Sequence, residues 1–237
     1  MIDIHSHLLF GVDDGAKSLE ESIDVLKDLA NYGYTDIILT PHYIKGSAYN
    51  SSRKENFKKL DVLKKALIEN NISINLYLGN EIYIDDDLLE LFKKGEISTL
   101  NNTNYALIEL PMSGVYEGYK EIFSELISKG CRVILAHPER YKSFQKDFNK
   151  IYELENIGVL FQSNLDSING RYGEGAEKTI RRLLQEKKIA FLATDIHQKK
   201  HDYHKWEEAK TEILKYITNE EFNILIKENP NQLINRY

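Results

Sequence analysis

Short apolar runs alternate with longer segments of helical periodicity along the whole chain. The runs Ile37-Ile38-Leu39 and Val133-Ile134-Leu135 contain no polar residue. Uninterrupted runs of this kind are typical of strands that are buried on both faces of a parallel sheet. The pattern predicts strands at seven places, namely residues 2–5, 36–40, 74–78, 105–110, 133–136, 159–162 and 189–193.

Helical segments fill the intervals between these strands. Ser18-x-x-Glu21 has the spacing of a capping box before the first helix, and Ser52 directly precedes the second. Three glycines are expected to end helices, and they are Gly95, Gly130 and Gly158. Helices are predicted over residues 20–30, 53–69, 86–94, 117–129, 148–156, 176–187, 205–216 and 219–227.

The strict alternation of strands and helices indicates an α/β fold around a parallel sheet. We predict a distorted TIM-like (β/α)7 barrel, with a doubly wound open sheet as the alternative. The chain contains only 4 Pro and 13 Gly and offers no linker or low-complexity segment. A single domain over residues 1–237 is therefore expected.

Composition excludes several classes of partner. The net charge of −6 gives no basic footprint for nucleic acid or anionic lipid. No apolar run approaches the roughly 20 residues that span a bilayer, and the first residues lack the pattern of a signal peptide. Cys131 is the only cysteine, which suits a reducing compartment. We therefore expect a cytoplasmic protein with no direct membrane insertion.

Histidines and carboxylates follow six of the seven predicted strands. Because the carboxyl ends of the strands in a parallel barrel share one face, these residues are expected to converge there. They are His5 and His7 after the first strand, His42 after the second, Glu81 after the third, Glu109 at the fourth, His137 after the fifth, and Asp195 and His197 after the seventh.

The spacing and residue types of this set favour a metal site. Side chains at positions i and i+2 of an extended strand share one side, so His5 and His7 can bind one centre, as can Asp195 and His197. Imidazole and carboxylate ligands suit Zn, Mn or Fe. A lone histidine after a strand is more often structural, but the placement of the whole set at one topological position favours function.

The motifs around these residues resemble those of the PHP superfamily (polymerase and histidinol phosphatase). Within it, the chain is similar to the bacterial manganese-dependent protein-tyrosine phosphatases of capsule and exopolysaccharide loci. The matching stretches run in order along the chain and include Met1-Ile-Asp-Ile-His-Ser-His7, Val12-Asp-Asp-Gly15, Thr40-Pro-His42, Gly79-Asn-Glu-Ile-Tyr83, Ala106-Leu-Ile-Glu109, Ala136-His-Pro-Glu-Arg-Tyr141 and Asp195-Ile-His197.

This resemblance implies three divalent metal ions, with Mn²⁺ expected and Fe or Zn as alternatives. The first ion would be held by His5, His7 and Asp195, the second by Glu81 as a bridge together with Glu109 and His137, and the third by Asp14, His42 and His197. Spacing alone leaves Asp13 as plausible a ligand as Asp14.

Three residues are predicted to contact substrate. The resemblance assigns Arg140 to the phosphate, where it would also serve catalysis, while Tyr43 and Arg171 are candidates from their positions beside ligands or on the same face. Family members often carry an arginine in the loop after the Asp-x-His element. Here that loop reads Gln198-Lys-Lys-His-Asp-Tyr203, so Lys199 or Lys200 is the candidate substitute.

The function implied is hydrolysis of phosphotyrosine, with a membrane-associated bacterial tyrosine autokinase of capsule or exopolysaccharide synthesis as the expected substrate. Metal ions would outweigh the carboxylates locally and supply an activated water for in-line attack. Cys131 is excluded as a nucleophile, because no Cys-x5-Arg loop is present and the length of its strand puts it about 20 Å from His137. The alternatives are a histidinol-phosphatase-like enzyme for small molecules and a non-catalytic, metal-bound docking module.

Overall fold

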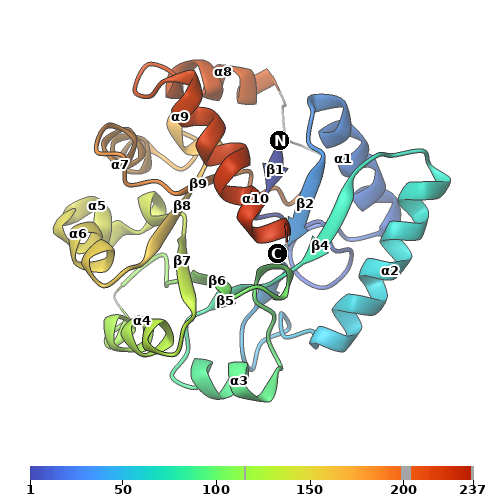
Figure 1. Cartoon of the computed structure of the whole chain (residues 1–237), viewed down its shortest axis with the longest axis horizontal. Helices are drawn as coiled ribbons and strands as arrows, with labels where there is room; N and C mark the ends of the chain where they lie inside the picture. Colours follow the sequence, from blue (N-terminus) through green and yellow to red (C-terminus); the bar gives the residue numbers. More distant parts are fainter. Residues whose placement is uncertain (115, 199–203, 236–237) are drawn as a thin grey trace.

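The computed structural model of the chain describes residues 1–114, 116–198 and 204–235. Its strands form two parallel sheets surrounded by helices (Figure 1). The smaller sheet has the order β1 (Ile2–Asp3), β2 (Asp36–Leu39), β4 (Asn75–Leu78). The larger has the order β3 (His42–Tyr43), β5 (Glu81–Tyr83), β6 (Tyr105–Glu109), β7 (Arg132–Ala136), β8 (Leu160–Asn164), β9 (Phe191–Ala193).

All seven predicted strands are present, and two of them continue after a break. β2 is followed by β3 beyond Thr40-Pro41, and β4 by β5 beyond Gly79-Asn80. Proline has no N–H to donate to a neighbouring strand. At Gly79 a Cβ atom would lie 2.7 Å from Leu100 Cδ2, so the chain approaches its neighbour as only glycine allows. These breaks place His42 and Glu81 in short second strands that pair with each other.

The two sheets are linked at the carboxyl ends of their outer strands. A parallel bridge joins Ser6 to Ile196, the His7 amide donates to the Ile196 carbonyl at 2.8 Å, and the Asp195 amide donates to the His5 carbonyl at 2.9 Å. The predicted α/β fold with parallel strands is thereby confirmed. Closure of both sheets into one barrel stays a prediction.

The predicted helices all occur, within a few residues of the expected bounds. They are α1 (Leu19–Tyr32), α2 (Arg53–Glu69), α3 (Leu88–Lys94), α4 (Tyr119–Ser128), α6 (Asn149–Asn156), α7 (Glu174–Gln185), α8 (His204–Ile213) and α9 (Asn219–Asn223). At α2 the capping box of Ser52 with Glu55 is complete. At α1 the Ser18 hydroxyl accepts from the Glu21 amide, as in a capping box. The Glu21 carboxylate, however, accepts from the amide of Lys17 and not from that of Ser18.

Two helices, α5 (Lys142–Lys146) and α10 (Asn229–Ile234), were not predicted. The last predicted helix ended at residue 227, whereas Pro230 lies in the first turn of α10, where the chain continues as helix. The π-helical turn η4 (Ile224–Glu228) carries α9 directly into α10. Short 3₁₀ turns complete the fold at η1 (Leu100–Asn102), η2 (Pro138–Arg140) and η3 (Leu165–Asn169).

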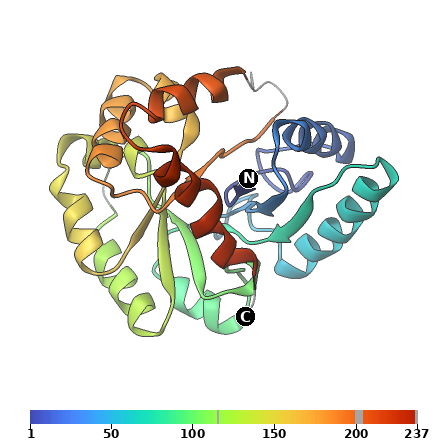
Figure 2. The same cartoon turned by 45° about the horizontal axis from the view of Figure 1, so that its top comes forward.

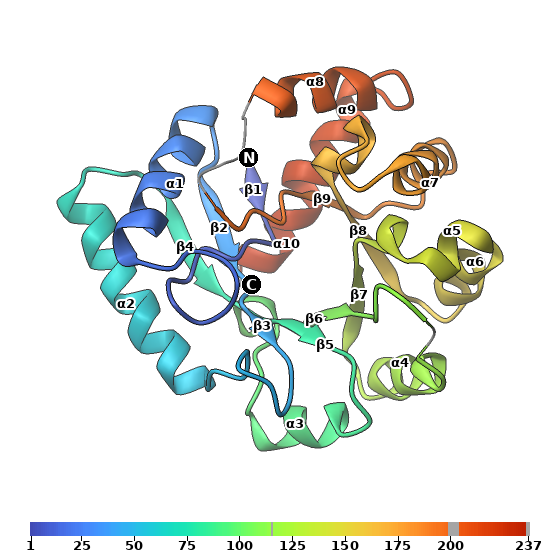
Figure 3. The same cartoon turned by 180° about the vertical axis from the view of Figure 1, so that it is seen from behind.

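Helix α10 covers one end of the strands. It crosses in front of them in Figure 1 and behind them in Figure 3, and it contacts β1 and η1. Leu233 of α10 is fully buried in a core cluster to which both sheets contribute, including Ile4, Ile38, Leu107 and Ile134. Figure 2 shows the same helix running across the strands from a second angle. Because α10 closes the amino ends, side chains at the carboxyl ends face away from it.

Candidate metal centre

The structure brings all nine predicted metal ligands together. Potential ligand atoms within each of four overlapping groups lie within 4.8 Å of one another. The groups are His7, Asp14, His42 and His197; His5, His7 and Glu81; His5, His137 and Asp195; and His42, Glu81 and Glu109. The convergence expected from topology is therefore observed, while the role of each residue as a ligand stays a prediction.

Glu81 lies at the middle of this cluster. Its Oε2 atom is 2.9 Å from His42 Nδ1 and 3.3 Å from the Nε2 atoms of both His5 and His7. Its Oε1 atom is 2.9 Å from His137 Nε2. One carboxylate at the start of β5 thus contacts imidazoles that follow three other strands, which is the arrangement expected of a bridging ligand.

Unusual backbone conformations turn two of the candidate ligands inward. His137 directly follows β7 with φ of 32°, and Asp195 follows β9 with φ of 53°. Such left-handed conformations are costly for residues other than glycine, by about 1–3 kcal/mol, and they concentrate at functional sites. Tyr141 supports this end of the sheet, because its hydroxyl accepts from the Leu110 amide at 3.0 Å and donates to the Ala136 carbonyl at 2.8 Å.

The charges of the cluster favour a cation. Burial, together with the neighbouring carboxylates of Glu81 and Asp195, raises the pKa of Glu109 to about 9. Burial also lowers the pKa of His137 and of His197 to about 4, with Arg140 adding to the shift at His137 and His7 at His197. At His5 and His7 the neighbouring carboxylates outweigh burial and raise the pKa of both rings. Carboxylates that attract protons in this way form an environment that a bound cation relieves.

Unpartnered buried atoms lead to the same conclusion. Within the described part of the chain, Asp14 Oδ1 and His137 Nδ1 are buried without a hydrogen-bond partner. A buried polar group left in this state costs about 1–3 kcal/mol. Imidazole nitrogen and carboxylate oxygen are ligands that Mn, Fe and Zn accept. The residues present therefore fit divalent cations of this kind.

The geometry favours Asp14 over Asp13 as the ligand. Asp14 Oδ1 lies 3.5 Å from the Nε2 atoms of both His42 and His197. Asp13 instead accepts from His7 Nδ1 at 2.8 Å, from the His42 amide at 3.0 Å and from the Gly15 amide at 2.9 Å. Its carboxylate is therefore occupied in orienting the two histidines. Gly15 is required here, since a Cβ atom would lie 1.9 Å from the His7 carbonyl oxygen.

The predicted substrate residues have different surroundings. Arg140 donates from Nη1 to Asp195 Oδ2 at 2.8 Å, and its guanidinium carbon lies 4.4 Å from the centre of the Tyr172 ring. Arg171 pairs with Asp166 at 2.6 Å and lies on the same tyrosine ring, at 5.6 Å. Both arginines therefore belong to one group beside the cluster. The predicted Lys199 and Lys200 lie outside the described residues.

Tyr43 does not lie beside the cluster as predicted. Its ring is 6% exposed and belongs to the core that includes Ile82 and Leu88. Burial and a hydrogen bond with Glu96 raise its pKa. Neighbouring residues of a strand face opposite sides, so when His42 points to the cluster Tyr43 must point away. The predicted contact between Tyr43 and substrate is thus not supported by the structure.

Several polar and aromatic neighbours of the cluster were missed from the sequence. The Tyr49 ring stacks on His42 at 6.0 Å between centres, and Tyr172 lies against Arg140. Gln162 and Asn164, near the end of β8, bond to His5 and Asp195. A signal for the last pair existed, because Gln162-x-Asn164 repeats the i, i+2 spacing of His5-x-His7 at the end of the sixth strand.

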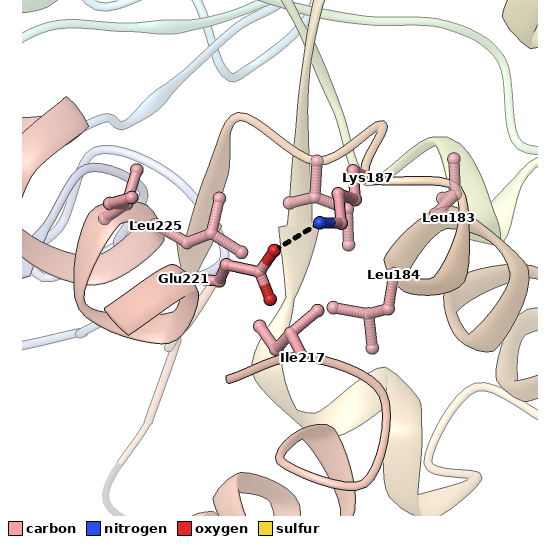
Figure 4. Close-up of a pocket in the computed structure, with 8 residues that line it drawn as sticks. Leu183, Leu184, Lys187, Ile217, Glu221 and Leu225 are labelled. Atoms are coloured by element: carbon pink, nitrogen blue, oxygen red, sulfur yellow. Dashed lines mark ion pairs between the residues drawn. The ribbon is translucent and has the colours of Figure 1, made fainter. Parts of the chain in front are cut away.

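A separate apolar pocket of about 100 Å³ lies between α7 and the α9–η4 segment (Figure 4). Leu183, Leu184, Ile217 and Leu225 line it, and Lys187 pairs with Glu221 across it. Its walls are mostly hydrocarbon, in contrast to the His and carboxylate cluster.

Within the residues that the structure describes, each helix is too short or too polar to cross a bilayer.

Known proteins are similar to this chain in sequence. The chain is 36% identical over 197 residues to the putative tyrosine-protein phosphatase CapC of Staphylococcus aureus, covering 83% of this chain and 77% of that one. It is 33% identical over 203 residues to the tyrosine-protein phosphatase CpsB of Streptococcus agalactiae serotype III (strain NEM316), covering 83% of each. The tyrosine-protein phosphatase YwqE of Bacillus subtilis is 32% identical over 200 residues, which are 84% of this chain and 78% of YwqE.

Solved structures of known proteins are similar to this chain in fold. A crystal structure from a study of YwqE of Bacillus subtilis and CpsB of Streptococcus pneumoniae, described there as metal-dependent tyrosine phosphatases, has a TM-score of 0.92 at 31% identity, covering 99% of this chain and 94% of that one. Histidinol phosphate phosphatase of Lactococcus lactis has a TM-score of 0.58 at 14% identity, covering 91% and 93%, and is similar in fold alone. The family model for capsular polysaccharide synthesis, CpsB/CapC, matches residues 1–235, and the chain belongs to this family.

Proposed function

We propose that this chain is a metal-dependent phosphatase that hydrolyses phosphotyrosine in proteins. The observation that carries the proposal is the cluster of nine His, Asp and Glu residues around Glu81, in a chain whose relatives are named tyrosine-protein phosphatases. The proposal covers a single domain over residues 1–237, which the family match over residues 1–235 supports.

Three divalent ions, with Mn²⁺ as the proposed metal, would be held by the residues of the cluster. His5, His7 and Asp195 would bind the first, Glu109, His137 and the bridging Glu81 the second, and Asp14, His42 and His197 the third. The groups of closely spaced ligand atoms are consistent with this division. When bound, the ions would supply Lewis acidity that activates water and offsets the charge of the phosphoryl group.

Arg140 is proposed to bind the phosphoryl oxygens. Its guanidinium is held from one side by Asp195 and from another by the Tyr172 ring. A guanidinium has five N–H donors in a planar fork, so donors remain after the bond to Asp195 is made. A cation held in place before the reaction stabilises charge on phosphorus-bound oxygens without a cost of reorganisation.

We also infer that the two sheets are arcs of one distorted (β/α)7 barrel. The bridge from Ser6 to Ile196 and the core cluster shared by β1, β2, β6, β7 and β9 support closure. In a barrel, every strand end would contribute to one face. The proposed substrate is a membrane-associated bacterial tyrosine autokinase of capsule or exopolysaccharide synthesis, on which the chain would act from the cytoplasm, and the family to which the chain belongs supports it.

Comparison of two substrates tests the proposed function. We expect kcat/KM for a phosphotyrosine peptide to exceed that for histidinol phosphate in protein loaded with Mn²⁺. The reverse order would replace the proposal by a small-molecule phosphatase. Inactivity on both substrates, with the metals shown to be bound, would favour a docking module.

Substitution of Cys131 by Ser should leave the phosphatase rate within a few-fold of the wild type. Thiol-dependent phosphatases attack phosphorus with a thiolate and lose turnover when the cysteine is replaced. Burial raises the pKa of Cys131 to about 11, so the thiol stays protonated at neutral pH. Cys131 packs beside Leu126 at the opposite end of β7 from His137.

The measurement is hydrolysis of a phosphotyrosine peptide by Cys131→Ser and wild type, before and after treatment with a thiol alkylator. EDTA should stop both proteins equally. A folded, metal-loaded Cys131→Ser protein without activity would rule out a mechanism based on the metal cluster.

A further inference from the structure

Strand β8 contributes no predicted metal ligand, although it lies between two strands that do. Its last residues, Gln162, Ser163 and Asn164, are nevertheless polar and fully buried. Buried polar side chains are costly unless they are hydrogen-bonded. Gln162 and Asn164 are two residues apart and therefore share one side of the strand. Their hydrogen bonds indicate their role.

The two amides form a chain of hydrogen bonds between two candidate ligands of the same metal. Gln162 Oε1 is 2.8 Å from His5 Nδ1, and Gln162 Nε2 is 2.9 Å from Asn164 Oδ1. Asn164 Nδ2 is in turn 2.7 Å from Asp195 Oδ2. His5 and Asp195 belong to one group of closely spaced ligand atoms. Strand β8 therefore couples the residue after β1 to the residue after β9.

The donors and acceptors in this series of hydrogen bonds can be arranged in only one way. Asp195 Oδ2 accepts from Arg140 as well as Asn164, and a carboxylate oxygen in such a position only accepts. Asn164 must therefore present its NH₂ to Asp195, and its oxygen to Gln162. Gln162 must then donate through its own NH₂, which leaves its oxygen for His5. An amide oxygen only accepts, so the proton of His5 must sit on Nδ1.

We propose that Gln162 and Asn164 are positioning residues of the metal centre, which hold His5 as the Nδ1–H tautomer so that its Nε2 lone pair faces the metal site. The inference rests on the proposed function, because it concerns a cation bound by His5. His5 Nε2 does face the cluster, at 3.3 Å from Glu81 and 3.4 Å from Asp195.

Two other histidines bond to an acceptor through Nδ1, and they reach the same tautomer by a simpler route. His7 Nδ1 faces the Asp13 carboxylate at 2.8 Å, and His197 Nδ1 faces the Asp195 carbonyl at 2.9 Å. Each of these partners only accepts, so it sets the tautomer alone. The Gln162 amide could present either its oxygen or its NH₂ to His5, so Gln162 alone could not set the tautomer of His5. Asn164 should therefore determine the proton position on His5, which it does not touch.

The tautomer of His5 can be measured in metal-free protein by ¹⁵N NMR, at a pH high enough for the ring to be neutral, since Nδ1 and Nε2 shift differently when protonated. We expect the Nδ1–H form in the wild type, with the signals assigned by their loss in His5→Gln. In Gln162→Met and in Asn164→Leu we expect a mixture of tautomers. Gln162→Glu should restore the Nδ1–H form, because a carboxylate only accepts. Ser163→Ala, on the same strand but outside the chain of bonds, is the matched control.

Metal affinity provides the second readout. Loss of a partner that orients a ligand typically costs about 10–100-fold in metal affinity. Titration of Mn²⁺ against a fluorescent chelator should show a weakening of this size for Gln162→Met and Asn164→Leu, and a change of at most a few-fold for Gln162→Glu and Ser163→Ala.

The proposal is overturned if wild-type His5 carries its proton on Nε2, a result that needs no variant to fold. It is also overturned if folded Gln162→Met keeps both the Nδ1–H tautomer and wild-type affinity. Failure of the proposed function is a different result, namely a wild-type protein that binds no Mn²⁺ while His5 remains in the Nδ1–H form.

Discussion

Removal of divalent cations should reduce phosphotyrosine hydrolysis to the rate without enzyme, and Mn²⁺ should restore it better than Mg²⁺. Five of the nine candidate ligands are histidines, whereas Mg²⁺ prefers oxygen ligands and retains its waters. The measurement is peptide hydrolysis by protein treated with EDTA, freed of the chelator and then supplied with each metal. Circular dichroism must show that the metal-free protein is still folded.

Stability gives an independent check on the same prediction. A ligand that binds only the folded protein at 100 times its Kd adds about 2.7 kcal/mol to the free energy of unfolding. Titration with Mn²⁺ should therefore raise Tm as well as activity. The burial and crowding of Glu81, Glu109 and Asp195, which raise the pKa of Glu109, are the physical reason for expecting this gain. Full activity in protein shown by elemental analysis to hold no metal would contradict the proposed function.

Substitution of Arg140 by Ala should lower kcat by about 10²–10³-fold while leaving the metal content unchanged, because loss of one group that stabilises transition-state charge has an effect of this size. Asp195 uses Oδ1 toward His5 and His7, and Oδ2 toward Arg140. Removing the guanidinium therefore leaves the oxygen that faces the cluster in place. Turnover of a phosphotyrosine peptide and bound metal per chain are the two measurements.

Two further variants distinguish a phosphate contact from a general effect of charge. Arg140→Lys keeps one charge but loses the planar fork, so we expect only partial activity. Arg182→Ala removes a surface guanidinium that pairs with Glu186 and lies on Phe148, and its rate should match the wild type. Near-normal turnover in Arg140→Ala, or loss of its metals, would show that Arg140 does not act on the substrate.

The candidate ligands were predictable because the chain places them at repeated positions. All except Asp14, which only the family resemblance assigned, lie at or after the end of a predicted strand, and parallel strands put all such positions at one end. The alternation of side chains along a strand could also have predicted that Tyr43, which follows His42, faces away from the cluster. The burial of Tyr43 in the core agrees with this alternation and gives no support to a contact with substrate.

The sequence by itself determined the alternation of strands and helices and the identity of the residues that converge, since these depend on local pattern and residue type. Spacing left Asp13 and Asp14 equally plausible, and the tertiary structure distinguishes them, because the role of each depends on which histidine nitrogen its carboxylate reaches. The tertiary structure alone connected Gln162 and Asn164 with His5, since residues 157 positions apart meet only when β1 and β8 are placed in space. Hydrogen-bond direction is a property of such three-dimensional neighbours, and no periodicity in the chain encodes it.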